Sequence, residues 1–119
     1  MTSRFVHVAG RRLTEQLADT MFALSTPSRV QILMCLLDGP HTVGELMEEL
    51  EMEQSAVSHQ LRVLREHTLV KAERVGRRRL YAVHDEHVVS LLNAALQHVE
   101  ERAGSTRRRA VARRRQATG

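Results

Sequence analysis

The side chains of residues 84–102 that can bind a metal ion include Asp85, His87, His98 and Glu101. Imidazole nitrogens and carboxylate oxygens are ligands for Zn²⁺, and they suit Co²⁺ as well. His87 and His98 would lie on nearly the same face of a helix, but about 16 Å apart along its axis. One helix therefore cannot bring all four side chains to one ion.

Two copies of this helix packed antiparallel can bring the ligands together. A twofold axis near the middle of the helix sets His87 of one chain opposite His98 of the other. The same axis nearly pairs Asp85 with Glu101. Asp85 and His87 point about 200° apart on a regular helix, so Asp85 must ligate from the non-helical position before it. The spacing therefore predicts two equivalent sites in a homodimer, held together by an apolar seam of Val88, Leu91, Leu92, Ala95 and Val99.

The chemistry of this ligand set favours zinc. Two imidazoles and two carboxylates suit tetrahedral Zn²⁺, with Co²⁺ acceptable, whereas Ni²⁺ normally takes more ligands. His7 or Glu100 could supply an additional ligand, so a nickel or cobalt sensor stays an alternative. The simplest alternative is that Asp85 only caps the helix and that the other three side chains are solvated. Four protein ligands leave no open position for a substrate, and no nucleophile, phosphate loop or cofactor motif is present, so we expect no enzyme.

Helices must position these ligands, and helical periodicity covers most of the chain. Thr26 followed by Pro27 marks one helix start, and Thr42 with Glu45 forms a capping box at another. Two short runs rich in β-branched residues flank Gly76 and predict a β-hairpin. The sequence therefore predicts a mainly α fold with a β-hairpin wing, a winged helix-turn-helix. Its five helices are expected over residues 11–24, 27–38, 42–50, 54–66 and 85–102.

The predicted helix over residues 54–66 has one apolar and one polar face. Val57, Leu61 and Leu64 fall on the side that would contact the preceding helix. Short hydroxyls and an imidazole near the start of the opposite side suit a helix that reads base edges in the major groove. Standing alone, such a face would equally be a solvated surface. The residues of this helix expected to contact bases or phosphates are Ser55, Ser58, His59, Arg62 and Arg65.

A basic hairpin tip follows this helix. The tip reads GRRR and places three cations side by side, Arg77, Arg78 and Arg79. A flexible cationic loop of this kind can contact the DNA backbone or the minor groove. Together with the polar helix face, it makes double-stranded DNA the expected partner.

The residues from "LSTPSRVQIL" through "QSAVSHQLRVLRE" to "GRRRLYAV" resemble the ArsR/SmtB family of bacterial metal-responsive repressors. The resemblance covers residues 15–102. It implies a dimeric winged-helix repressor that binds operator DNA, with its first and fifth helices forming the dimer interface. It also implies which positions read bases, and these are Gln54, Ser55, Ser58 and His59.

The resemblance extends to the metal site. Asp85, His87, His98 and Glu101 match the family's zinc site on the fifth helix without a departure. The family's second type of site needs cysteines on the third helix, where this chain reads GELMEELE, so no thiolate site is expected, and Cys35 is expected in the core. By implication, metal binding weakens operator binding. Activation by metal, and a signal other than metal, stay alternatives.

Charge and composition set limits on the whole chain. Of 18 Lys and Arg and 14 Asp and Glu, six arginines and no acid follow residue 102, so residues 1–102 carry 12 positive and 14 negative charges, a net charge of −2. No apolar run could span a bilayer, no secretory signal is present and Cys35 is the single cysteine, which predicts a cytoplasmic protein away from membranes. The expected organisation is a flexible arm at 1–10, a DNA-binding and dimerisation domain at 11–102, and a disordered arginine-rich tail at 103–119.

Overall fold

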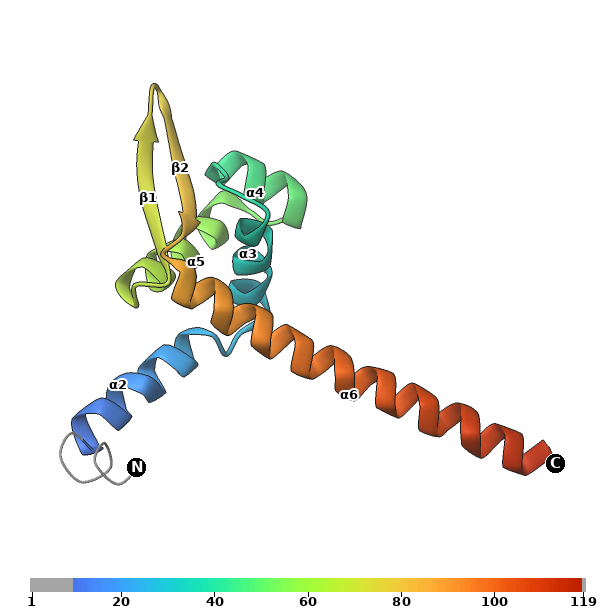
Figure 1. Cartoon of the computed structure of the whole chain (residues 1–119). Helices are drawn as coiled ribbons and strands as arrows, with labels where there is room; N and C mark the ends of the chain where they lie inside the picture. Colours follow the sequence, from blue (N-terminus) through green and yellow to red (C-terminus); the bar gives the residue numbers. More distant parts are fainter. Residues whose placement is uncertain (1–9, 119) are drawn as a thin grey trace. The chain divides into compact units, whose positions relative to one another are not determined.

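The computed structural model describes residues 10–118, and the chain divides into two compact units after Asp85. The predicted flexible arm, including His7, lies outside the described residues apart from Gly10. The prediction of a mainly α, winged helix-turn-helix fold is confirmed. The first unit contains α2 (Gly10–Ala23), α3 (Pro27–Leu37), α4 (Val43–Leu50), α5 (Gln54–Glu66), β1 (Val70–Val75) and β2 (Arg78–Val83), and the second contains α6 (Glu86–Thr118) (Figure 1).

Both predicted capping signals form in the structure. The Thr26 hydroxyl accepts a hydrogen bond from the amide of Arg29 at 3.4 Å, and Pro27 occupies the first helical position of α3. The Thr42 hydroxyl accepts from the amide of Glu45 at 3.1 Å, while the Glu45 carboxylate accepts from the amide of Thr42 at 2.8 Å. These reciprocal bonds satisfy amide groups that a helix start otherwise leaves without partners. They fix where the first helix of the helix-turn-helix begins.

The core of the first unit lies between α3, α4 and α5. Val57, Leu61 and Leu64 of α5 are buried, as their spacing predicted. Burying an aliphatic side chain of this size contributes about 1.5–3 kcal/mol, so the apolar face of α5 is firmly held and its polar face must point outward. The other fully buried aliphatic side chains of this core are Ile32, Leu33 and Leu46.

The β-hairpin is anchored at its base. β1 and β2 pair antiparallel from Val70 opposite Val83 to Val75 opposite Arg78, and the turn contains Gly76 at φ 63°, a conformation that favours glycine. At the base of the hairpin, His41 and Tyr81 exchange two backbone hydrogen bonds of 2.9 and 2.8 Å. These bonds tie the hairpin to the segment before α4.

A buried arginine links α2, α3 and α5. The Arg29 side chain is only 7% exposed. Its Nε donates to the carbonyl oxygen of Ala23 at 2.6 Å and one Nη donates to that of Phe22 at 3.2 Å, while the other Nη donates to Oε1 of Gln60 at 3.0 Å. Arg29 thus satisfies carbonyls in the last turn of α2, where a positive charge also interacts favourably with the helix dipole.

Replacing Arg29 with methionine is expected to lower the free energy of unfolding by about 2–3 kcal/mol, because the buried carbonyls and Gln60 lose their donor while the aliphatic volume is kept. Urea denaturation followed by circular dichroism measures the change. Arg65→Met, an equivalent substitution at an exposed position of α5, is the control and should change stability by less than about 0.5 kcal/mol. Equal stabilities of the two variants would contradict this role of Arg29.

Helix α2 keeps most of its apolar side chains exposed. Leu13, Leu17 and Met21 recur every four residues, so they form one stripe, and Leu17 is 56% exposed. Phe22, at the end of the helix, is 71% exposed. No single helix among residues 10–118 is long and apolar enough to cross a membrane, although the bent pair formed by α2 and α3 passes the same test on length and composition.

Helix α6 is longer than expected. The sequence predicted a disordered tail after residue 102, whereas the structure continues the helix to Thr118. The segment contains no proline, and Ala, Arg and Gln, which make up most of it, have high helix propensity. Low apolar content argues against a folded core but not against a helix, and the prediction of disorder rested on apolar content alone.

Candidate nucleic-acid interface and metal site

The predicted base-reading residues share the exposed face of α5. This face follows from the burial of Val57, Leu61 and Leu64 on the other side of the helix. Side chains near the start of α5 are short, so the helix backbone could approach base edges closely. All six predicted contact residues of α5 are exposed, and they are Gln54, Ser55, Ser58, His59, Arg62 and Arg65.

A hydrogen bond determines which ring nitrogen of His59 accepts and which one donates. Nη2 of Arg62 lies 3.2 Å from Nδ1 of His59. A guanidinium can only donate, so Nδ1 is the acceptor and the ring proton of the neutral imidazole lies on Nε2. His59 therefore presents a donor beyond the arginine, suited to an acceptor such as guanine N7 or a phosphate oxygen. Arg62 is itself a predicted DNA contact, and in the structure it also orients His59.

The three wing arginines have different surroundings. All three are exposed. Nη2 of Arg78 forms an ion pair with Oε1 of Glu45 at 3.2 Å, and the guanidinium of Arg79 lies 5.3 Å from the ring centre of Tyr81. Hydrogen bonds from Thr42, aided by the charge of Arg78, lower the pKa of the Glu45 carboxyl. Arg77 lies in the turn itself, which makes it the wing cation best placed to contact DNA.

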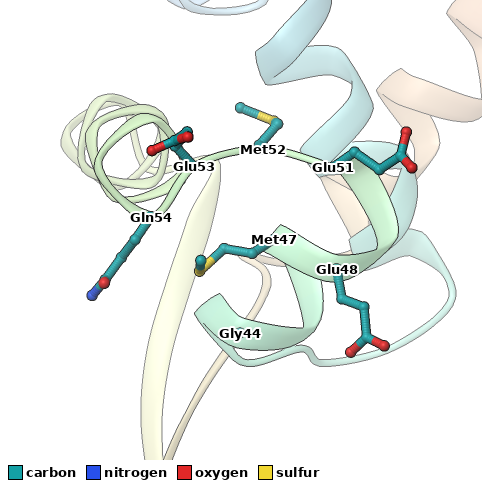
Figure 2. A pocket seen from close by; sticks show the side chains of 7 residues that line it. All are labelled: Gly44, Met47, Glu48, Glu51, Met52, Glu53 and Gln54. Carbon is teal, nitrogen blue, oxygen red and sulfur yellow. The ribbon is translucent and has the colours of Figure 1, made fainter.

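A hollow lined partly by carboxylates borders the start of α5. It lies at the turn between α4 and α5 and is lined by Gly44, Met47, Glu48, Glu51, Met52, Glu53 and Gln54. In Figure 2 the side chains of Glu53 and Gln54 point in different directions from the start of α5. Carboxylates repel phosphates, so the acidic lining of this hollow makes it a poor place for a DNA phosphate.

The predicted metal ligands lie near both ends of residues 84–102. Asp85 immediately precedes α6, in the non-helical position that its proposed role requires. Nε2 of the neighbouring His84 lies 3.9 Å from Oδ2 of Asp85. His87 lies in the first turn of α6, whereas His98 and Glu101 lie three residues apart near its middle, and all three are exposed. Nε2 of Gln97 donates to Oε1 of Glu101 at 3.3 Å.

A site built from these ligands needs a second chain. Within residues 10–118 of the single chain, no three His, Cys, Asp or Glu side chains come close enough to hold a metal ion. Neutral imidazoles and carboxylates still form a chemically suitable set for Zn²⁺ or Co²⁺. A zinc site made of these four residues therefore requires two paired chains.

Cys35 is partly buried, not fully buried as expected for a core residue. Burial raises the pKa of its thiol to about 11, and a hydrogen bond to Glu49 and the charges of Glu49 and Asp38 act in the same direction. Metal ions bind the thiolate form of cysteine. A protonated thiol beside carboxylates is a poor metal ligand at neutral pH.

The Cys35 thiol is expected to react with a disulfide reagent such as DTNB roughly 100-fold more slowly in the folded protein at pH 8 than an ordinary cysteine does, because its thiolate fraction is low. The rate should rise with pH towards the raised pKa of about 11. Absorbance of the released thionitrobenzoate measures the rate, and protein unfolded in guanidinium provides the reference. A folded-state rate equal to the unfolded-state rate would contradict the raised pKa.

Comparison with known proteins places the chain in a family. Residues 26–72 match the family model for the bacterial regulatory protein, arsR family. The chain is 53% identical over 85 residues to the HTH-type transcriptional regulator NmtR of Mycobacterium tuberculosis, and the match covers 71% of each chain. It is 39% identical over 87 residues to a transcriptional repressor SmtB homolog of Synechocystis, covering 73% of this chain and 66% of the homolog.

A solved structure agrees with these relatives. The homodimeric winged helix-turn-helix DNA-binding domain of a possible ArsR-family regulator from Mycobacterium bovis superposes with a TM-score of 0.74 at 29% identity, covering 77% of this chain and 85% of that one. Because the relatives are transcriptional regulators, the prediction of a DNA-binding regulator and not an enzyme is confirmed. The chain therefore belongs to the ArsR/SmtB family of metal-responsive winged-helix transcriptional repressors.

Proposed function

We propose that this chain forms a homodimer that binds operator DNA when metal-free and releases it when a divalent metal, Zn²⁺ above all, binds between two α6 helices. The observation that carries the proposal is the placement of ligands around α6. Asp85 precedes the helix, His87 and His98 lie on nearly one face of it, and Glu101 lies one turn beyond His98. The proposed protein acts on DNA in the cytoplasm.

Exposed apolar side chains on two helices support the dimer. Leu13, Leu17 and Met21 of the α2 stripe are 42%, 56% and 45% exposed, and Val99 of α6 is 61% exposed. Large apolar side chains left exposed along a helix are typical of a protein interface. The relative from Mycobacterium bovis is homodimeric. We therefore assign the dimer interface to α2 and α6, the first and fifth helices of the fold.

Each dimer would hold two equivalent metal ions. Asp85 and His87 of one chain and His98 and Glu101 of the other would complete four-coordinate sites. His98 and Glu101 are neighbours on the helix surface, and Gln97 orients the Glu101 carboxylate. The two ions would join the α6 helices, one at each end of their contact.

Metal binding then acts through the geometry of the dimer. A dimeric winged-helix protein must present its two α5 helices about 34 Å apart to enter successive major grooves. A metal that prefers a dimer conformation with a different separation weakens DNA binding by the same free energy, typically about 1–3 kcal/mol. Operator affinity would then fall by about 5- to 150-fold.

Fluorescence anisotropy of labelled operator DNA tests this function. Zn²⁺ should weaken binding by the wild-type dimer, whereas Mg²⁺, which prefers six oxygen ligands, should not. Unchanged operator affinity at saturating Zn²⁺, Co²⁺ and Ni²⁺ would overturn the proposal in favour of a family member that responds to another signal. Stronger binding with metal would make the protein a metal-dependent co-repressor or activator.

A nickel or cobalt sensor is the second candidate, because an additional ligand such as Glu100 is available next to Glu101. Tetrahedral and octahedral Co²⁺ differ strongly in visible absorption. Intense absorption of the Co²⁺-loaded dimer supports four ligands and zinc sensing. Weak absorption supports six ligands and nickel sensing.

A further inference from the structure

We propose that the arginine-rich end of α6, residues 103–116, is a second DNA-binding element. It binds phosphates of the duplex that flank the base pairs contacted by α5. The proposal extends the proposed function and uses its antiparallel pairing of α6 at one step. The residues that carry it are Arg107, Arg108, Arg109 and Arg113.

The positive charge of this segment is concentrated in a short stretch. Residues 103–116 contain six arginines and no acid, whereas residues 1–102 carry a net charge of −2. Arg107, Arg108, Arg109 and Arg113 are all exposed, and no acidic side chain among the described residues forms an ion pair with them. Since the rest of the chain is slightly acidic, long-range attraction to DNA must come from this segment and from local clusters such as the wing.

The cations lie on two sides of the helix. Arg107, Arg108 and Arg115 line one shallow groove together with Val111 and Ala112. Arg109 and Arg113 are one helical turn apart on the roughly opposite side. A helix in a DNA groove has a phosphate backbone on each side, so cations on both sides suit it. Guanidinium groups also bind phosphate oxygens in a bidentate way.

A membrane surface fits this segment less well than DNA does. Amphipathic helices that bind membranes gather large apolar residues on the face opposite their cations. Here the only large apolar side chain of the segment is Val111, and it lies among the arginines of the groove. The segment therefore has no apolar face to insert into a bilayer.

The proposed dimer would leave the segment uncovered. The pairing that sets His87 opposite His98 also sets Glu86, the first residue of the partner's helix, opposite residue 99. Residues beyond 99 thus extend past the end of the partner's α6, and the arginines from 107 to 115 span about 12 Å of that extension. Helical order in this stretch keeps the charges at defined spacing, which reduces the entropy lost on binding.

The test compares two full-length variants at the same four positions. One variant replaces Arg107, Arg108, Arg109 and Arg113 with glutamine, and the control replaces the same four residues with lysine. Both substitutions keep a high helix propensity, but only the lysine control keeps the positive charge. Anisotropy titrations over a range of salt concentrations use operator DNA and random DNA of equal length. Circular dichroism checks the helix content of both variants.

For the glutamine variant, the slope of log K, where K is the association constant for DNA, against the logarithm of the salt concentration should be shallower by at least about 2. At low salt its affinity should fall at least about tenfold, and by a similar factor on operator and on random DNA. The lysine variant should stay close to the wild type. An unchanged salt dependence in the glutamine variant would overturn the proposal. The proposal would also be overturned if this variant lost binding to anionic phosphatidylserine vesicles and kept its DNA affinity. Because the salt dependence is measured without metal, it tests the segment even if wild-type protein shows no response to Zn²⁺.

Discussion

His98→Ala is expected to abolish the response of operator binding to Zn²⁺ and to leave the metal-free operator affinity within about threefold of the wild type. His98 is exposed on α6, outside the DNA-reading face of α5, so its loss should not alter base contacts. In the proposed dimer it is one of two imidazoles at each ion, and a tetrahedral site that loses an imidazole binds Zn²⁺ far more weakly. In the wild type, Zn²⁺ should lower operator affinity by about 5- to 150-fold, whereas in His98→Ala it should leave the affinity about unchanged.

Anisotropy titrations of the same labelled operator with and without Zn²⁺ measure both quantities. Ser90→Ala is the matched control, because it shortens an exposed polar side chain of α6 that is not a proposed ligand. This control should respond to Zn²⁺ like the wild type. A full zinc response in His98→Ala would exclude the proposed site even if the protein proves to be a metal sensor.

Ser58→Asp is expected to weaken operator binding by at least about 100-fold. Ser58 lies on the exposed face of α5, and an aspartate there would replace a short hydroxyl with a carboxylate near base edges and phosphates. Loss of one base contact costs about 1–3 kcal/mol, and a dimer carries the substitution in both half-sites. Like-charge repulsion adds to this cost.

Quantitative gel shifts at fixed salt concentration compare Ser58→Asp with Ser90→Asp, which adds the same charge at an exposed serine of α6. The second variant should bind operator within about threefold of the wild type. Thermal denaturation shows whether either variant is misfolded. Operator affinity of Ser58→Asp close to that of Ser90→Asp would remove the exposed face of α5 from the DNA interface.

The sequence predicted the elements whose signals are local. A hydroxyl followed by proline at Thr26, and a hydroxyl with a glutamate three residues later at Thr42, act through hydrogen bonds within one helical turn. The burial of the apolar face of α5 likewise follows from spacing on one helix. Asp85 falls just before α6, as the geometry of ligation required.

Features that depend on distant residues were not predicted. An arginine in a sequence is normally read as a surface residue, and Arg29 is buried only because Gln60, 31 positions away, and the end of α2 satisfy it. The one available signal was its spacing, because Arg29 lies on the same face of α3 as the buried Ile32, Leu33 and Leu36. Arg78 meets Glu45 over 33 positions, and no local pattern indicates that pair. The pairing of the metal ligands lies between chains, so it remains a prediction.

Complementation between two inactive variants tests the shared metal site most directly. One variant carries Asp85→Ala and His87→Ala, and the other carries His98→Ala and Glu101→Ala. Each homodimer should fail to bind Co²⁺ tightly, because every site lacks two ligands. Unfolded together and refolded, the two chains form about half heterodimers, each with one complete site.

Visible absorption of Co²⁺ titrated into the refolded mixture is the measurement. We expect intense tetrahedral absorption that saturates at about one ion per heterodimer and is absent from either variant alone. Absorption in either homodimer, or none in the mixture once exchange of chains has been verified, would contradict a site shared between two α6 helices.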